Sequence, residues 1–251
     1  MAALEAGRLL MAGLEKGPAV IESKSTGTDL VSDLDRASEE LILHTLAADR
    51  PDDAVLAEEG SDRTGTTGVR WVIDPLDGTV NFVYGIPVFA VSIAAEVDGV
   101  VVAGVVHDPC RQETFTALLG GGSRLNGRSL KVNSPPDLSM SLVGTGFAYE
   151  ASVRRLQGGA MSEILGRVRD IRRAGSAALD LCAVAAGRLD AYFERGTHHW
   201  DRAAGSLIAR EAGAVVGDLF GPVPCDALVL AVAPSVADAF RELLAEVGAQ
   251  S

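Results

Sequence analysis

The stretch Arg70-Trp71-Val72-Ile73-Asp74-Pro75-Leu76-Asp77-Gly78-Thr79 says more about this chain than any other segment. Its β-branched and aromatic start is typical of a buried strand, and we expect Pro75 to end that strand because proline has no N–H to donate. Two carboxylates, Asp74 and Asp77, would then lie three residues apart in the following turn. Because two such anions repel each other unless a cation lies between them, the spacing favours a metal site.

The end of this stretch adds a second kind of binding group. Gly78 and Thr79 stand where a short helix is expected to begin, and free backbone N–H groups at a helix start are suited to a phosphate. The alternative is an ordinary Asx-turn with a helix cap, which is a common use of aspartate after a strand. The motif alone does not decide between these two interpretations.

Two further acidic sites favour the metal interpretation. Upstream, Ala54–Ala57 is expected to be a strand that ends in Glu58. Downstream, Asp201 precedes a segment with helical spacing and is expected to open that helix. Taken singly, Glu58 is explained as a solvated loop residue and Asp201 as a helix cap. Together with Asp74 and Asp77 they supply enough carboxylate oxygen for two or three Mg²⁺ ions.

Three segments carry a resemblance to a known family. Ala57-Glu58-Glu59, Asp74-Pro75-Leu76-Asp77-Gly78-Thr79-Val80-Asn81-Phe82 and Trp200-Asp201-Arg202-Ala203-Ala204-Gly205 resemble, in order, the patterns of the inositol monophosphatase family. The resemblance continues through segments 24–31, 84–87, 144–147, 175–178 and 190–194. Within the family, the chain most resembles the actinobacterial SuhB-type inositol-1-monophosphatases. The resemblance implies a layered α+β and α/β fold, the αβαβα sandwich of the sugar phosphatases. It also implies one domain over residues 1–251, with halves 1–138 and 139–251 and metals between them.

The resemblance also implies roles for individual residues. The first Mg²⁺ would be held by Glu58, Asp74 and the Leu76 carbonyl, the second by Asp74, Asp77 and Asp201, with a third, weaker ion near Glu58. Thr79, oriented by Asp35 and helped by Glu58, would position or deprotonate the attacking water; a helix-capping or surface acid is the alternative for Asp35. The phosphate would lie over Gly78 and Thr79, and substrate hydroxyls would meet Asp77, the Ala177 backbone, Glu194 and Asp201.

Other polar residues have simpler explanations. Lys24 could lie over the phosphate, but a lone lysine in a polar loop is usually solvated. His198 and His199 beside Trp200 are expected to pack and to form hydrogen bonds where the helix begins. Gly120-Gly121-Gly122 lacks the Gly-Lys-Ser/Thr continuation of a phosphate loop and is expected to be a flexible turn.

The implied reaction is Mg²⁺-dependent hydrolysis of a phosphate monoester by an activated water, with myo-inositol 1-phosphate first among the substrates. Family members that act on fructose 1,6-bisphosphate, histidinol phosphate or 3′-phosphoadenosine nucleotides provide the alternatives. A haloacid dehalogenase phosphatase is disfavoured because its two aspartates are two residues apart, whereas Asp74 and Asp77 are three apart. A regulatory, RNA-polymerase-associated protein is the alternative of another class. A homodimer and lithium inhibition are also implied by the resemblance.

Composition constrains the remaining possibilities. The net charge of −12 over 251 residues disfavours a nucleic-acid surface. The one basic cluster, residues 167–173, is expected to face solvent or a partner subunit. Three cysteines without a Cys-x-x-Cys pair indicate neither a disulfide framework nor a zinc site. The absence of a long apolar run or a signal pattern predicts a cytoplasmic protein that does not enter a membrane.

Periodicity predicts the order of the elements. Helices are expected over Ala2–Lys16 and Asp33–Ala48, followed by antiparallel strands with a tight turn at Asp98-Gly99. These strands are expected over Val88–Val97, Val100–His107 and Thr114–Leu118. The second half is expected to alternate strands Leu142–Gly144, Ile171–Ala174 and Asp190–Phe193 with helices Val153–Val168, Ala177–Ala186 and Asp201–Ala212.

Overall fold

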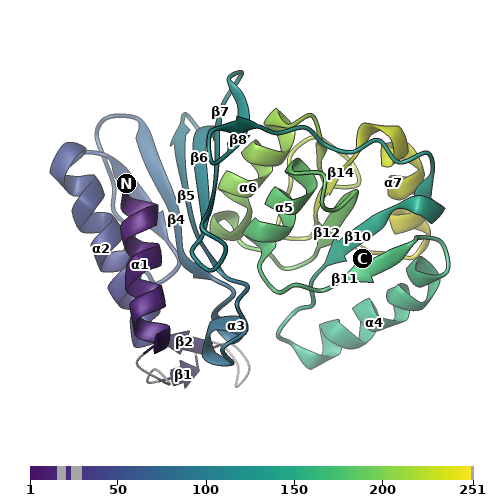
Figure 1. Cartoon of the computed structure of the whole chain (residues 1–251), viewed down its shortest axis with the longest axis horizontal. Helices are drawn as coiled ribbons and strands as arrows, with labels where there is room; N and C mark the ends of the chain where they lie inside the picture. The colour runs from purple at the N-terminus through teal and green to yellow at the C-terminus, as the bar shows by residue number, and fades with distance from the viewer. Residues whose placement is uncertain (16–20, 24–29, 250–251) are drawn as a thin grey trace.

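The protein folds into alternating helical and sheet layers, as the computed structural model shows for residues 1–15, 21–23 and 30–249 (Figure 1). A helix pair is followed by a seven-stranded sheet, a second helix pair, a five-stranded sheet and an outer helix pair. This order is the αβαβα sandwich that the family resemblance implies. No helix in the described ranges is both long enough and apolar enough to cross a membrane.

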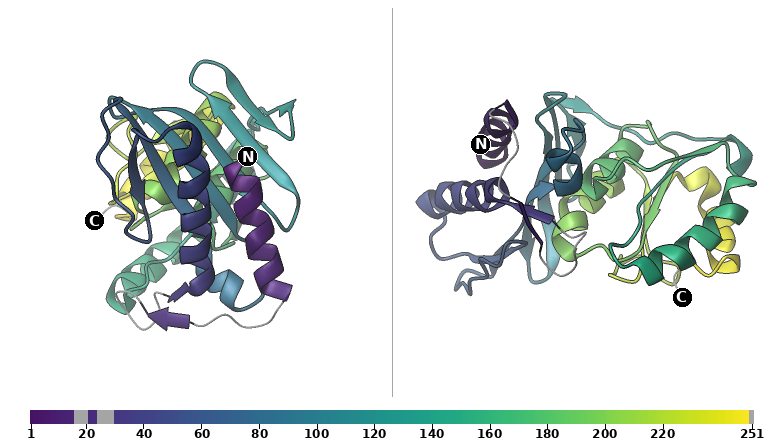
Figure 2. Two further views of the ribbon diagram at one scale, coloured as in Figure 1. Left: turned by 90° about the vertical axis from the view of Figure 1, so that its left-hand side faces the viewer. Right: turned by 90° about the horizontal axis from the view of Figure 1, so that it is seen from below.

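The outer helices on the N-terminal side are α1 (Ala2–Glu15) and α2 (Asp33–Asp49). They lie side by side over one face of the seven-stranded sheet, as Figure 2 shows. Apolar residues on α1 and α2, including Leu10 and Ile42, pack against the strand residues Ile73 and Ile93. The short strands β1 (Ile21–Ser23) and β2 (Leu30–Ser32) pair with each other beside these helices.

The seven-stranded sheet has its strands in sequence order. Its members are β3 (Ala54–Ala57), β4 (Val69–Asp77), β5 (Ala90–Val97), β6 (Val100–Asp108), β7 (Glu113–Leu118), β8 (Gly122–Leu125) and β9 (Arg128–Ser129). Only the β3–β4 pair is parallel. The hairpin between β5 and β6 turns at Asp98 and Gly99, which have φ values of 51° and 78°, and two positive φ values are what a tight primed turn requires.

The central layer consists of α5 (Ala177–Ala185) and α6 (His199–Glu211). Both belong to the second half of the sequence, yet their apolar side chains pack against the seven-stranded sheet as well as against the five-stranded one. The core formed this way includes Val72, Phe115, Leu181, Cys182, Leu207, Tyr192 and Val229. The Cys182 side chain is fully buried in this core.

The five-stranded sheet has the order β11-β10-β12-β14-β13. These strands are β10 (Leu142–Thr145), β11 (Asp170–Arg172), β12 (Ala191–Glu194), β13 (Val215–Gly217) and β14 (Val229–Val232). The outer helices α4 (Ala151–Leu165) and α7 (Ala237–Glu246) cover its other face. The strands predicted in the second half are β10, β11 and β12, and β10 pairs with both of the others in parallel. Strands β13 and β14 were not predicted; β14 pairs antiparallel with β12 and with β13.

Two predictions of element boundaries are wrong, and both concern the site. Strand β4 does not end at Pro75 but continues to Asp77, with a shift of register against β5 between Asp74 and Asp77. The missing proline N–H is tolerated because the ladder is already interrupted there and β3 pairs only as far as Ile73. Helix α6 begins at His199 rather than at Asp201, so Asp201 is the third helical residue.

Candidate active site

The irregular end of β4 presents the two aspartates of the central motif. Asp74 is 1% exposed, and its Oδ1 accepts a hydrogen bond from the Leu76 N–H at 3.0 Å. The register shift that follows places Asp77 opposite Ala90 after two unpaired residues. A regular strand would point residues 74 and 77 to opposite faces, because alternation has a period of two. The irregularity therefore lets both carboxylates line one pocket.

Asp77 joins the two halves of the fold. Its Oδ2 accepts hydrogen bonds from the Ser176 hydroxyl at 2.6 Å and from the Ala178 N–H at 2.7 Å, at the start of α5. Ser176 also caps this helix through a bond from the Leu179 N–H at 3.2 Å. Burial raises the pKa of Asp77 to about 6, although the bonds from Ser176, Ala178 and Ala177 favour its charged form. The Ala177 N–H is thus directed at Asp77, and a substrate hydroxyl would have to share it.

Thr79 is the first residue of the short helix α3 (Thr79–Val83), so the predicted helix start after Gly78 is confirmed. Its Oγ1 lies 3.0 Å from Asp35 Oδ1 and 3.1 Å from the Leu76 carbonyl oxygen. A hydroxyl has one proton, so it donates to only one of these acceptors at a time. When Thr79 donates to Asp35, the Leu76 carbonyl oxygen, which lines the pocket, is free of that proton and can interact with a cation.

Asp201 is held by the start of α6. Its Oδ2 accepts a hydrogen bond from the His198 N–H at 2.7 Å. The His198 ring stacks on the Trp200 ring with centroids 4.9 Å apart, and His199 bonds to the buried Glu96 of β5. These contacts agree with the packing and hydrogen-bonding roles predicted for the two histidines. They tie the helix that carries Asp201 to the seven-stranded sheet.

Glu58 follows β3, and its N–H donates to the Ile73 carbonyl oxygen at 3.2 Å, which fixes it beside the end of β4. The carboxyl groups of Glu58, Asp74, Asp77 and Asp201 act on one another. The pKa of Asp74 is raised well above its usual range by burial and by the charges of Glu58, Asp77 and Asp201. The pKa of Asp201 is raised by burial and by Asp77 and Glu58.

Such mutual repulsion of buried carboxylates is relieved by a cation, and carboxylate and carbonyl oxygens are the ligands that Mg²⁺ prefers. The donor set therefore fits a divalent metal in its chemistry. No group of three or more His, Cys, Asp or Glu side chains within the described ranges already has metal-ligating geometry. The two-ion ligand set remains a prediction.

The pocket itself has a volume of 270 Å³ and lies between the two halves of the sequence. It is lined by Glu58, Asp74, Leu76, Asp77, Gly78, Thr79, Phe147, Ala148, Tyr149, Arg173, Gly175, Ala177, Glu194, Arg195, Gly196, Thr197, His198, Trp200 and Asp201. Every predicted site residue except Asp35 lines it, and Asp35 reaches it through Thr79. A larger hollow of 440 Å³ on the seven-stranded sheet contains none of the predicted residues.

Glu194 ends β12 and lines the pocket. Its Oε2 accepts a hydrogen bond from the Tyr192 hydroxyl at 2.7 Å. Burial raises its pKa, while Tyr192 and Arg173 oppose that shift. A Cβ atom on Gly146 would lie 2.0 Å from the Glu194 carboxyl carbon, so the absence of a side chain at position 146 makes room for this carboxylate.

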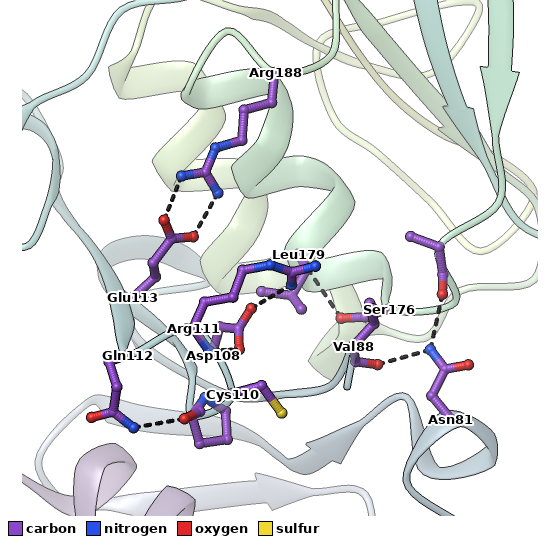
Figure 3. A network of polar contacts seen from close by, with 12 residues as sticks. Asn81, Val88, Asp108, Cys110, Arg111, Gln112, Glu113, Ser176, Leu179 and Arg188 are labelled. Carbon is purple, nitrogen blue, oxygen red and sulfur yellow. Dashed lines mark hydrogen bonds and ion pairs between the residues drawn. The ribbon is translucent and has the colours of Figure 1, made fainter. Parts of the chain in front are cut away.

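A polar network that includes α3 links the two halves of the chain (Figure 3). The Asn81 amide of α3 donates to the Val88 carbonyl oxygen at 2.8 Å and to the Ala174 carbonyl oxygen at 2.9 Å. In the connection that follows α5, the two terminal guanidinium nitrogens of Arg188 meet the Glu113 carboxylate of β7. The sequence interpretation used Asn81 only as part of a motif and did not identify this scaffolding contact.

Several lining residues were missed from the sequence. Ser176 was quoted only for resemblance, although a serine three residues before an apolar helical position is a recognisable cap. Phe147, Tyr149, Arg173 and Thr197 lie in connections between elements, where no local pattern indicates which way a side chain faces. Lys24 lies outside the described residues.

Comparison with known proteins agrees with the geometry. The family model of the inositol monophosphatase family matches residues 1–249. The chain is 49% identical over 240 residues to the inositol-1-monophosphatase SuhB of Mycobacterium tuberculosis H37Rv, covering 91% of this chain and 81% of that protein. It is 42% identical over 222 residues to the Nus factor SuhB of Escherichia coli K12, covering 88% of this chain and 83% of that protein.

Solved structures show the same relationship. The extragenic suppressor protein SuhB of Bartonella henselae superposes with a TM-score of 0.92 at 36% identity, covering 97% of this chain and 95% of that one. The layers, the positions of the three acidic segments and these similarities have one explanation: the chain belongs to the inositol monophosphatase family.

Proposed function

We propose that this protein is a Mg²⁺-dependent phosphate monoester hydrolase whose first substrate is myo-inositol 1-phosphate. The observation that carries the proposal is the convergence of Glu58, Asp74, Asp77 and Asp201 with the Leu76 carbonyl and the Gly78-Thr79 turn in one pocket. These donors come from separate segments of the fold. The pKa values of Asp74, Asp77 and Asp201 are raised by burial and by neighbouring carboxylates.

In this proposal Glu58, Asp74 and the Leu76 carbonyl hold one Mg²⁺, and Asp74, Asp77 and Asp201 hold another. Bound Mg²⁺ would polarise the phosphate, lower the pKa of the attacking water and stabilise the negative charge on the leaving oxygen. The chain itself orients the reactants. Thr79, held by its hydrogen bond to Asp35, positions the water, and Glu58 accepts the proton that the water loses.

The substrate would be oriented by groups on both halves. Backbone N–H groups of Gly78 and Thr79 would receive the phosphate, and Asp77, Ala177, Glu194 and Asp201 would meet the hydroxyls of the polyol. Glu194 is already held in place by the Tyr192 hydroxyl, so little conformational freedom would be lost on binding.

Phosphate release tests the proposal. D- and L-myo-inositol 1-phosphate, fructose 1,6-bisphosphate, histidinol phosphate and 3′-phosphoadenosine 5′-phosphate would each be offered with Mg²⁺ and with EDTA. We expect EDTA-sensitive turnover that favours inositol phosphate and falls roughly 100-fold or more in Asp74→Asn. Asp170→Asn is the matched control, because Asp170 is exposed and pairs with Arg172 away from the pocket. No metal-dependent turnover of any ester would contradict the proposal.

A regulatory function is the second candidate, because a relative at 42% identity is a Nus factor. The acidic net charge of −12 does not favour direct binding to RNA, so such a role would rest on contacts with protein. Copurification with RNA polymerase would be compared for the wild type and Glu58→Gln. Equal copurification of an inactive variant would support a binding role that does not need the carboxylate site.

A further inference from the structure

Arg202 is a buried arginine that directly follows the predicted metal ligand Asp201. It is the fourth residue of α6 and is 6% exposed. Arginine side chains are rarely buried to this degree unless their charge is paired or hydrogen-bonded. The sequence interpretation used Arg202 only as part of the motif that contains Asp201. Its charge must therefore be matched by contacts inside the fold.

The guanidinium of Arg202 connects the segment before α6 to the segment before β14. Its Nη1 donates a hydrogen bond to the Thr197 carbonyl oxygen, and its Nη2 donates to Asp226 Oδ1 at 2.7 Å. The Asp226 carbonyl oxygen accepts a hydrogen bond from the Gly196 N–H at 2.8 Å. Gly196 and Thr197 line the pocket, whereas the Asp226 side chain is 71% exposed. Arg202 thus holds a pocket-lining segment and is itself oriented by a carboxylate at the surface.

One peptide group joins Arg202 to Asp201. The carbonyl oxygen of the Thr197–His198 peptide accepts the bond from Arg202, and the N–H of the same peptide donates to Asp201 Oδ2 at 2.7 Å. A cation at the carbonyl end and an anion at the N–H end polarise the peptide in the same direction, so each hydrogen bond strengthens the other. The Asp201 carboxylate is therefore held by a chain of hydrogen bonds that starts at Arg202.

We propose that Arg202 is a positioning residue for Asp201, oriented by Asp226 and acting through the Thr197–His198 peptide. Arg202 lies outside the pocket lining, so it acts on the site through other groups. It fixes the direction of the Asp201 carboxylate before a cation is bound. Losing a hydrogen-bonded neighbour of a metal ligand typically weakens metal binding by roughly 10- to 100-fold. The inference rests on the proposed function, in which Asp201 is a ligand of the second Mg²⁺.

The planar fork of the guanidinium distinguishes this role from that of a nearby positive charge. Its two terminal nitrogens serve two acceptors, Thr197 and Asp226, whereas a lysine ammonium presents a point charge. Arg202→Lys therefore keeps the charge beside Asp201 and loses the fork, and Arg202→Met removes both. Asp226→Asn keeps the arginine and weakens only its orientation. Because the Asp226 side chain is exposed, this last variant should fold normally.

Metal binding in the absence of substrate tests the inference. Calorimetric titration with Mn²⁺, used as a probe for the Mg²⁺ sites, gives the dissociation constants. We expect Arg202→Met to weaken binding roughly 10-fold or more and Arg202→Lys to lose most of the same affinity. Asp226→Asn should lose less, since an ion pair with an exposed carboxylate contributes little by itself.

Arg210→Met is the matched control. Arg210 also lies on α6 and donates to the Pro222 carbonyl oxygen at 3.1 Å, in the same connection between β13 and β14 that contains Asp226. It is exposed and lies outside the pocket lining, so its loss should leave Mn²⁺ affinity at the wild-type value. Melting temperatures verify that each variant is folded, and Arg202→Lys and Asp226→Asn carry the test if Arg202→Met does not fold.

Amide hydrogen exchange at His198 gives a second readout that needs neither metal nor turnover. In EDTA, the His198 N–H is protected by its bond to Asp201. Arg202→Met and Arg202→Lys should accelerate its exchange several-fold, because the other end of the peptide is released. Arg210→Met should leave the exchange rate unchanged.

Where the wild type binds Mn²⁺, the inference requires both effects. Unchanged affinity in the two Arg202 variants would overturn it even if exchange accelerates, since the hydrogen bonds would then be merely structural. Equal losses in Arg210→Met would overturn it as well. Failure of the proposed function looks different: the wild type would bind Mn²⁺ no more tightly than Asp74→Asn. In that case the His198 exchange rates alone decide whether Arg202 positions Asp201.

Discussion

Asp77 combines a structural and a chemical role in one carboxylate. Its Oδ2 holds the Ser176 hydroxyl and the start of α5, while the same side chain lines the pocket beside Asp74. Burial disfavours its charged form, and hydrogen bonds from the helix start favour it. Because burial has the larger effect, the carboxylate costs folding free energy whenever it is charged without a cation beside it.

This balance predicts a pH dependence of stability in the metal-free protein. The folded-state pKa of Asp77 is about 6, above its ordinary value of 3.8, so the folded protein holds the proton more tightly than the unfolded chain. Its contribution to stability is therefore present below about pH 4 and lost as the pH rises through about 6, a change on the order of 3 kcal/mol.

Asp77→Asn removes the titrating group and keeps a similar shape. In EDTA, we expect the free energy of unfolding of the wild type to fall relative to this variant between about pH 4 and about pH 6. Urea unfolding at several pH values measures the difference. Parallel stability curves for the two proteins would show that Asp77 does not retain its proton in the folded state.

At the scale of elements, the site depends on chain segments that approach each other closely. The residue after β10, Gly146, lies against the Glu194 carboxylate at the end of β12, with no space for a Cβ atom. The neighbouring helix α4 contains another glycine, Gly158, around which nothing lies within 4 Å. The two glycines therefore give a matched pair in which the same substitution meets opposite surroundings.

We predict that Gly146→Ala destabilises the fold by roughly 1–3 kcal/mol, because the new methyl group displaces Glu194 or the end of β10. Gly158→Ala is expected to stabilise it by about 0.5–1 kcal/mol, since alanine lowers the backbone entropy of the unfolded chain and nothing obstructs the methyl group. Urea unfolding of both variants measures the signs. Similar effects from both would contradict the close packing of Gly146 against Glu194.

At the scale of the whole molecule, the central helices make the two sheets depend on each other. Helices α5 and α6 bury side chains against both sheets, and Asp77, Asn81 and Arg188 add polar links between the halves. The seven-stranded sheet would expose one apolar face without these helices. We therefore propose that residues 1–251 form a single cooperative unit, although the two sheets come from separate halves.

Differential scanning calorimetry tests this proposal. We expect one transition with a ratio of calorimetric to van't Hoff enthalpy of about 1, provided that unfolding is reversible. A fragment of residues 1–138 should show no cooperative transition, since it lacks α5 and α6. Two resolved transitions in the whole protein, or a fragment that melts cooperatively, would contradict a single unit.

Local patterns in the sequence were sufficient for much of this structure. Apolar periodicity located most strands and helices, Asp98-Gly99 specified its turn, and the acidic segments at 58, 74–79 and 201 indicated a metal site, for which the family resemblance implied a phosphatase. These features depend on neighbours within a few residues, which the sequence displays directly. The antiparallel strands β13 and β14 were not predicted; both are short apolar segments, which periodicity alone does not distinguish from other buried segments.

Other features depend on contacts between distant segments. The register shift that turns Asp74 and Asp77 to one pocket arises between β4 and β5, and no pattern within residues 70–79 specifies it. Likewise, the capture of Asp77 by Ser176, the space that Gly146 leaves for Glu194 and the entry of Arg173 into the pocket join residues far apart in sequence. The sequence alone determines which chemical groups the site contains. Their burial, their raised pKa values and the orientation of their side chains follow from packing the two halves together.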